Sequence, residues 1–181
     1  MVTTEVQVQE EAIVNLKKSD FLANNRNKEQ FFQLLTDKLS EANVLCKNTV
    51  ADADTLIVET AIERASSGEK VIIVGEDVDL LVLLVARTPS SCSSVLFMES
   101  GKGNTATRVY DDIHHIPENI PNIKNRILLA HSVSGCDTTS AVYRKGKLAS
   151  YRIFEKKQLD EIVNIFNDPE SDQEIIFEAG C

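Results

Sequence analysis

Apolar residues recur every three or four positions in several parts of the chain, which is the spacing of one face of an amphipathic helix. Residues 27–40 show this pattern first, with Asn27 as the predicted N-cap and Gln30 three residues later to complete a capping box. Residues 51–68 carry apolar side chains on more than one helical face and end at Gly68. We therefore predict two helices here and expect the second to be packed on two sides.

Three further helical patterns follow in the second half of the chain. Pro121 opens the first, which ends at Gly135, and Asp137 is placed to cap the next helix. Residues 158–168 form an amphipathic helix, and the acidic stretch 168–174 is expected to be a loop.

Runs of β-branched and other apolar residues separate the helices. Residues 70–75 have the composition of a central parallel strand, and a short, very apolar helix follows over 76–86. Two more strands, 95–100 and 106–111, are joined by a glycine-rich turn, and the short segment 42–46 is predicted to be a buried strand. Because strands and helices alternate, the predicted fold class is α/β with a mostly parallel sheet flanked by helices.

The composition narrows the choice of function. The net charge is −9, which argues against a protein that binds polyanions over its whole surface but allows a local basic patch. The four cysteines are widely spaced and form no C-x-x-C pair, so we expect reduced thiols in a nuclear or cytoplasmic protein that is neither secreted nor membrane-bound. Cys136 is expected to be a small buried residue and His131 a core or helix-face histidine.

Five aspartates are predicted to meet at one edge of the sheet. Asp52 and Asp54 follow one predicted strand, Asp77 and Asp79 follow the next, and all four stand at helix starts; Asp137 stands at a third helix start. In an open α/β sheet the carboxyl ends of the strands face one crevice. For any one of these aspartates, helix capping is an equally good explanation.

Several converging carboxylates call for a cation, because two of them about 4 Å apart repel by roughly 4 kcal/mol at an effective dielectric of about 20. Carboxylate oxygens suit Mg²⁺ or Mn²⁺, and two such ions can promote phosphodiester cleavage. A basic stretch begins seven residues after Asp137 and would hold a nucleic-acid backbone beside the metal site. Its predicted contact residues are Arg144, Lys145, Gly146, Lys147 and Arg152. The alternative is a solvated charged surface.

Three stretches, ADADTLIVETAI, VIIVGEDVDLLVLL and SGCDTTSAVYRKGK, resemble in order and spacing three motifs of the flap endonuclease/XPG-type 5′ nucleases, which have a PIN-like fold. They resemble still more closely a group of uncharacterised invertebrate PIN-like proteins. The resemblance covers about residues 28–157. It implies a Rossmann-like sheet followed by a helix–turn–helix, with the five aspartates as metal ligands. It also implies that the turn at residues 144–147 binds the DNA backbone and K⁺.

The family's core begins with an Asp-bearing strand that has no counterpart here, so we expect the chain to be a fragment. We predict three parts. Residues 1–27 form an N-terminal segment that is either disordered or a fragment of an upstream core, and residues 28–137 form a partial nuclease core. Residues 138–181 form the helix–turn–helix and a C-terminal helix with an acidic tail. The predicted function is a metal-dependent, structure-specific nuclease acting on nucleic acid, DNA rather than RNA. Two alternatives stay open: a PIN-like module that binds nucleic acid or protein without cleavage, and a phosphatase or receiver-like domain with an acidic Mg²⁺ pocket.

Overall fold

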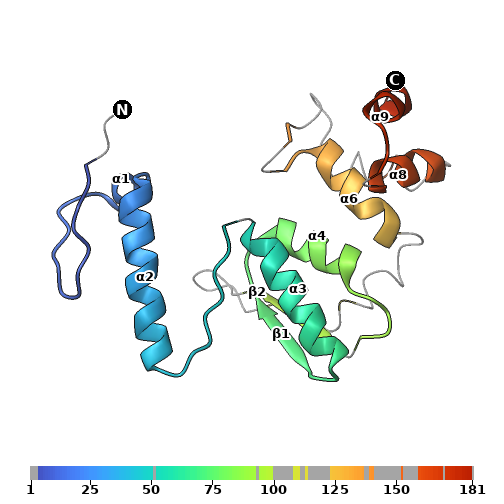
Figure 1. Cartoon of the computed structure of the whole chain (residues 1–181). Helices are drawn as coiled ribbons and strands as arrows, with labels where there is room; N and C mark the ends of the chain where they lie inside the picture. The colour runs from blue at the N-terminus through green and yellow to red at the C-terminus, as the bar shows by residue number, and fades with distance from the viewer. Residues whose placement is uncertain are drawn as a thin grey trace. The chain divides into compact units, whose positions relative to one another are not determined.

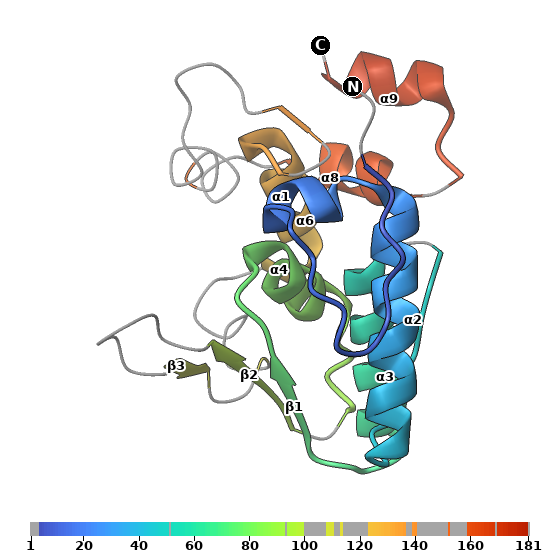
Figure 2. The same cartoon turned by 90° about the vertical axis from the view of Figure 1, so that its left-hand side faces the viewer.

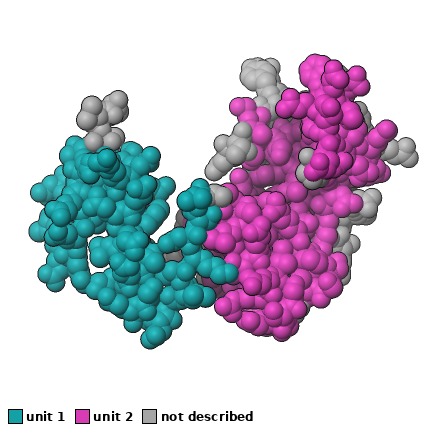
Figure 3. Space-filling model, viewed as in Figure 1, with its two compact units in different colours: residues 1–50 teal, residues 51–181 magenta. Residues whose placement is uncertain are grey.

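The computed structural model describes most of the chain in two compact units, residues 1–50 and residues 51–181 (Figure 3). The described residues are 4–50, 52–92, 94–99, 108–110, 113, 123–136, 139–140, 152, 159–168 and 170–180. The domain division at residues 27 and 137 stays a prediction, and the boundary between the compact units lies at residue 50.

The first unit consists of two helices and an extended N-terminal segment. Helix α1 spans Lys18–Leu22 and helix α2 spans Asn25–Glu41 (Figure 1). The prediction that Asn27 caps α2 is wrong, because the Asn24 side chain accepts the N–H groups of Arg26 and Asn27 instead. The predicted capping box therefore does not form.

Asn27 and Gln30 use their side-chain amides to hold the N-terminal segment. Asn27 is fully buried; its Oδ1 accepts the Val6 N–H at 2.8 Å and its Nδ2 donates to the Thr4 carbonyl at 3.0 Å. Gln30 repeats the arrangement one turn later with the Val8 N–H and the Val6 carbonyl. The two side chains thus pair with an extended backbone as a neighbouring strand would, and the segment runs alongside α2 (Figure 2).

The predicted strand at 42–46 is also wrong, because these residues end α2. Asn43 adopts a φ of 58°, its N–H bonds to the Ser40 carbonyl, and the Val44 N–H bonds to the Leu39 carbonyl. This pair of hydrogen bonds is the Schellman arrangement that satisfies the last carbonyls of a helix. Val44 and Leu45 are left about half and three-quarters exposed, so the apolar residues of this segment build no core.

The second unit is a mixed α/β arrangement built on a small sheet (Figure 1). Strand β1 (Val71–Val74) pairs in parallel with β2 (Val95–Glu99), which pairs antiparallel with β3 (Arg108–Tyr110). Helix α3 (Ala53–Ser66) precedes β1, and α4 (Val78–Arg87) connects β1 to β2. These elements confirm the predicted helices over 51–68 and 76–86 and the three strands, while the glycine-rich turn between β2 and β3 lies outside the described residues.

The described part of the second unit also contains the helices α6 (Ile123–Ser134), α8 (Asp160–Asn167) and α9 (Gln173–Gly180). The first two were predicted, whereas α9 takes up the end of the acidic stretch that was expected to be a loop. The short α1 of the first unit was not predicted either. Of the helix predicted to follow Asp137, only Thr139 and Ser140 are described, and neither is helical, because Thr139 pairs with Cys136 in an isolated bridge.

Helix α4 lies at the centre of the hydrophobic core. Leu80, Val82, Leu84 and Val85 are buried, and the helix packs against α3 and α6. Val95 and Phe97 of β2 extend the same core. A Cβ atom at Gly75 would lie 2.9 Å from the Leu80 Cδ2 atom, so a larger residue in the turn from β1 into α4 would require the Leu80 side chain to shift.

Strand β1 is not central in the described sheet, contrary to the prediction. The strand order is β1–β2–β3, which places β1 at an edge. Ile73 is buried, but Ile72 and Val74 are each more than half exposed. The β-branched run thus follows the alternation of a strand covered on one face only. Among the described residues, no helix combines the length and the apolar character that a membrane span requires.

Replacement of Asn27 by alanine should release the N-terminal segment. The Val6 N–H loses its acceptor, and an unsatisfied buried group costs about 1–3 kcal/mol. Hydrogen exchange measured by NMR should show faster exchange at Val6, and urea unfolding should show a lower free energy of unfolding. Asn25→Ala, an exposed position on the same helix, is the matched control. Unchanged exchange at Val6 would contradict the role given to Asn27.

Candidate functional site

Acidic residues occupy the starts of two helices that pack against each other. Asp52 is the N-cap of α3 and accepts hydrogen bonds from the Thr55 N–H and the Thr55 hydroxyl, both at 2.9 Å. Asp77 is the N-cap of α4 and accepts from the Asp79 N–H at 2.9 Å. Asp54 and Asp79 lie in the first turns. Helix capping, the alternative explanation of these aspartates, is therefore correct for Asp52 and Asp77.

The hydrogen bonds at the start of α3 also set the acidity of its cap. The Thr55 N–H, followed by the Thr55 hydroxyl, stabilises the ionised carboxylate and lowers the pKa of Asp52 below its usual value. A carboxyl group with a lowered pKa in the folded state stabilises the fold above its unfolded pKa, and this contribution is lost as the pH falls through the folded pKa. Asp52 is thus an anion at every pH above the acidic range.

The two pairs of aspartates reach the same end of the second unit by different routes. Asp77 and Asp79 follow β1, as predicted, but Asp52 and Asp54 do not follow a strand, because residues 44–50 form none. Both α3 and α4 nevertheless begin on the side of the sheet toward which β1 points (Figure 1).

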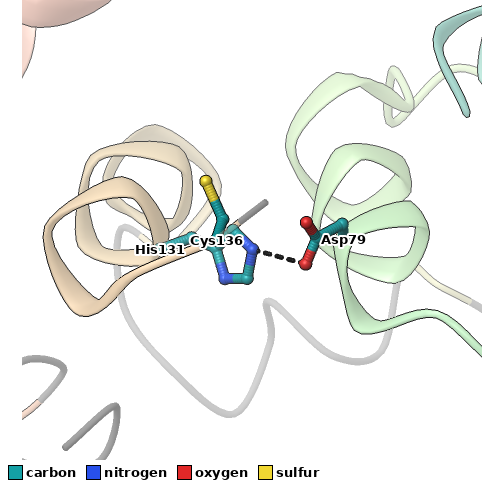
Figure 4. Close-up of side chains that lie close together, drawn as sticks. All are labelled: Asp79, His131 and Cys136. Atoms are coloured by element: carbon teal, nitrogen blue, oxygen red, sulfur yellow. Dashed lines mark hydrogen bonds and ion pairs between the residues drawn. The ribbon is translucent and has the colours of Figure 1, made fainter. Parts of the chain in front are cut away.

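A second cluster joins α4 to α6. The Asp79 carboxylate lies 2.8 Å from the Nε2 atom of His131, and the Cys136 thiol stands beside them (Figure 4). One ligand atom from each of these three residues lies within 4.8 Å of the other two. The His131 side chain is only 8% exposed, that of Asp79 is 26% exposed, and Cys136 is half-buried. The cluster therefore sits at the edge of the core, with one side open to solvent.

A short turn after α6 brings Cys136 to this position. Gly135 ends α6 with a φ of 94°, and the backbones of Cys136 and Thr139 then pair in an isolated antiparallel bridge. The Thr139 hydroxyl donates to the Ser132 carbonyl at 2.6 Å and lies 3.2 Å from the Cys136 sulfur atom. The turn folds the chain back against the end of α6 and holds the thiol beside His131.

Of the five predicted metal ligands, only Asp79 belongs to this three-residue cluster. Asp52, Asp54 and Asp77 are not members of it, and Asp137 lies outside the described residues. Among the predicted nucleic-acid contacts, Arg152 is exposed, and Arg144, Lys145, Gly146 and Lys147 lie outside the described residues.

Sequence reasoning did not assign His131 and Cys136 to a site. His131 was predicted to be a core or helix-face histidine, and it is indeed buried, but its partner Asp79 was not foreseen. One signal was available: Ile123, Ile127 and His131 are spaced four residues apart and share one face of α6, and the two isoleucines are buried. A histidine that continues a buried stripe faces the neighbouring element, here α4.

Comparison with known proteins identifies no relatives: no family model, no curated protein and no solved structure matches the chain. The function is therefore inferred from the residues and their geometry.

Thr55→Val should raise the pKa of Asp52 while leaving it below its ordinary value. The variant removes the hydroxyl donor, but the larger contribution, from the Thr55 N–H, stays. NMR titration of the Asp52 carboxyl group in metal-free buffer measures the pKa. Thr60→Val, later on the same helix, serves as the control. A pKa that does not move in Thr55→Val would show that the hydroxyl hydrogen bond is not made in solution.

Proposed function

We propose that the unit of residues 51–181 is a PIN-like, metal-dependent nuclease domain that hydrolyses phosphodiester bonds in nucleic acid. Its metal ligands are Asp52, Asp54, Asp77, Asp79 and Asp137. The order and spacing of the three motifs suggest this function, and the βαβ connection from β1 through α4 to β2 is compatible with a Rossmann-like sheet.

The observation that carries the proposal is the contact between the second and third motifs. Cys136 lies beside Asp79, although the two residues are far apart in the sequence. Cys136 immediately precedes Asp137 in the sequence, so the contact brings the third motif to the first turn of α4, which carries the acids of the second. A nuclease of this type requires the two motifs to meet.

The donor set also suits the proposed ions. Four aspartates at the starts of α3 and α4 offer hard carboxylate oxygens, which are the ligands that Mg²⁺ and Mn²⁺ prefer. When bound, two such ions supply an activated water molecule and stabilise the leaving oxygen of the phosphodiester. With Mg²⁺ or Mn²⁺ as the ion, His131 would orient the Asp79 carboxylate through their 2.8 Å hydrogen bond, as the hydrogen-bond partners of metal ligands commonly do.

Substrate binding is assigned to the basic stretch after Asp137. From residue 144 to 157 there are six basic residues and one acidic residue in a chain whose net charge is −9. Lysine and arginine side chains with a glycine-containing turn can bind a phosphate backbone without reading its sequence, and DNA is the expected partner. A K⁺ ion at this turn is part of the same proposal.

One observation favours a second candidate, a PIN-like module that binds nucleic acid without cleaving it. The Asp52 and Asp77 carboxylates each accept hydrogen bonds from their own helix start, which is sufficient reason for an aspartate at either position. In this second candidate the basic stretch keeps its role and the aspartates have only a structural one.

Asp77→Asn separates capping from metal binding. Asparagine caps a helix as well as aspartate does, so the thermal unfolding midpoint should stay within about 1 °C, whereas Asp77→Ala should lose about 1 kcal/mol. The asparagine variant lacks the negative charge, and Mn²⁺-dependent cleavage of a flap or nicked duplex should fall by about a hundredfold or more. Wild-type cleavage rates in both Asp77→Asn and Asp79→Asn would eliminate the nuclease assignment. Salt-dependent binding with no cleavage by the wild type would select the second candidate.

Charge reversal at Lys145 and Lys147 tests the binding segment. Each lost phosphate contact should reduce the slope of log K against log salt by about 0.9 on duplex DNA, and the affinity should fall for all sequences alike. Lys17→Glu with Lys18→Glu makes the same change of net charge at exposed positions of the first unit. Equal losses in the two double variants would show that the effect is one of net charge and not of a binding segment.

A further inference from the structure

Asp79, His131 and Cys136 combine three kinds of ligand that the proposed Mg²⁺ site would not combine. They come from the first turn of α4, the last turns of α6 and the turn after α6. We propose that these three residues form a binding site for a borderline-soft transition metal ion, Zn²⁺, which shares Asp79 with the carboxylate site for Mg²⁺ or Mn²⁺ and differs from it in the other two ligands. This proposal does not depend on nuclease activity, since it rests on two residues that the nuclease assignment does not use as ligands.

The distances fit a tetrahedral ion. Zinc binds cysteine sulfur at about 2.3 Å and histidine nitrogen or carboxylate oxygen at about 2.0–2.2 Å, which places neighbouring ligand atoms roughly 3.3–3.6 Å apart. The ligand atoms of the cluster all lie within 4.8 Å of one another, and His131 Nε2 and Asp79 Oδ1 are 2.8 Å apart. The three ligand atoms are therefore close enough together for side-chain adjustments to place them around one ion.

The state of His131 is an independent indication. Its side chain is more than nine-tenths buried, and its Nδ1 atom is buried without a hydrogen-bond partner among the described residues. Buried polar atoms in folded proteins are almost always paired, and an exception requires an explanation such as an ion or a catalytic role. In Figure 4 the Nε2 atom is directed toward Asp79 beside the Cys136 thiol, and the unpaired Nδ1 atom lies on the other side of the ring. Nε2 is therefore the nitrogen placed to bind the ion, and Nδ1 is the position that carries the ring proton when Nε2 does so.

The ligand types select the metal. A thiolate and an imidazole favour Zn²⁺ or Co²⁺, whereas Mg²⁺ requires oxygen ligands. Three protein ligands leave a fourth tetrahedral position for water, as in zinc sites that are open to a substrate. The half-buried positions of Asp79 and Cys136 are consistent with such an open side.

The hydrogen bonds around Cys136 show its metal-free form. The Thr139 hydroxyl donates to the Ser132 carbonyl and lies 3.2 Å from the Cys136 sulfur atom, a contact in which either group can be the donor. On metal binding the thiol proton leaves to solvent and the sulfur atom becomes a ligand. The Thr139 oxygen loses only this one contact and keeps its bond to Ser132.

Cobalt titration of the full-length, reduced, metal-free protein tests the site. One equivalent of Co²⁺ should produce a thiolate-to-cobalt charge-transfer band in the near ultraviolet and the intense visible bands of tetrahedral Co²⁺. Zn²⁺ should abolish these bands, and a large excess of Mg²⁺ should not. Cys136→Ser should lose the charge-transfer band, and His131→Gln and Asp79→Asn should each weaken Co²⁺ binding by about tenfold or more.

Matched controls come from the other described cysteines. Cys46 and Cys92 are also half-buried and free, and Cys92 contacts the Ser66 hydroxyl. Cys46→Ser and Cys92→Ser should keep the full cobalt spectrum. In the unaltered protein, Zn²⁺ should slow alkylation of Cys136 but not of Cys92, as measured by mass spectrometry of the two peptides, which avoids any dependence on how well a variant folds.

Three results would overturn the proposal: no charge-transfer band in the wild type, an unchanged band in Cys136→Ser, or equal Zn²⁺ protection of Cys136 and Cys92. None of these measurements involves nucleic acid, so a chain that fails to cleave DNA can still bind Zn²⁺ here. Conversely, cleavage that depends on Mn²⁺ with no cobalt spectrum would leave the nuclease proposal standing and remove this one.

Discussion

The burial of helix α4 is the constraint on which the second unit depends. Its sequence, VDLLVLLVAR, has charged groups only near its two ends, so almost its whole length must be removed from water. Helix α3 and helix α6 pack against it, and β2 contributes Val95 and Phe97 to the same core. The only acid within α4, Asp79, is consequently held at the edge of this core, where the face of α6 presents His131. The packing of α6 on α4 therefore places His131 beside Asp79 and creates the candidate site.

The sequence predicts well those elements whose signals are local. The helix over 51–68 ends at Gly68, which has a φ of 88°, and the apolar helix after β1 follows from composition alone. Asn27 and the segment 42–46 could not be predicted correctly, because each has two local explanations and tertiary or helix-end contacts decide between them. Asn27 fits a cap, but Asn24 is the cap and Asn27 binds the distant backbone at Thr4 and Val6. The central position predicted for β1 failed for a similar reason: a β-branched run does not say whether both faces are covered.

The same limit applies to the candidate site: its local features could be predicted from the sequence, and its contacts between distant residues could not. Aspartates at helix starts are a local pattern, and Asp52 and Asp77 occupy the N-cap positions. The pairing of Asp79 with His131 spans 52 residues and depends on which face of α6 meets α4. The four-residue spacing of Ile123, Ile127 and His131 contains that information, but it becomes useful only once α6 is known to pack on α4. The position of Cys136 depends further on the turn after Gly135, which the spacing of apolar residues does not predict.

Capping and cation binding are compatible at these helix starts. A carboxylate has two oxygen atoms with several lone pairs, and the cap hydrogen bonds from Thr55 to Asp52 and from Asp79 to Asp77 each engage one oxygen. The helix N-termini themselves oppose a cation, with roughly half a positive charge each. Two carboxylates at each helix start exceed the opposing charge of that helix about fourfold, so each helix start stays anionic even after it is capped. Capping alone would be served by one acid per helix; the second acid in each pair, Asp54 and Asp79, supplies the excess negative charge that a cation site needs.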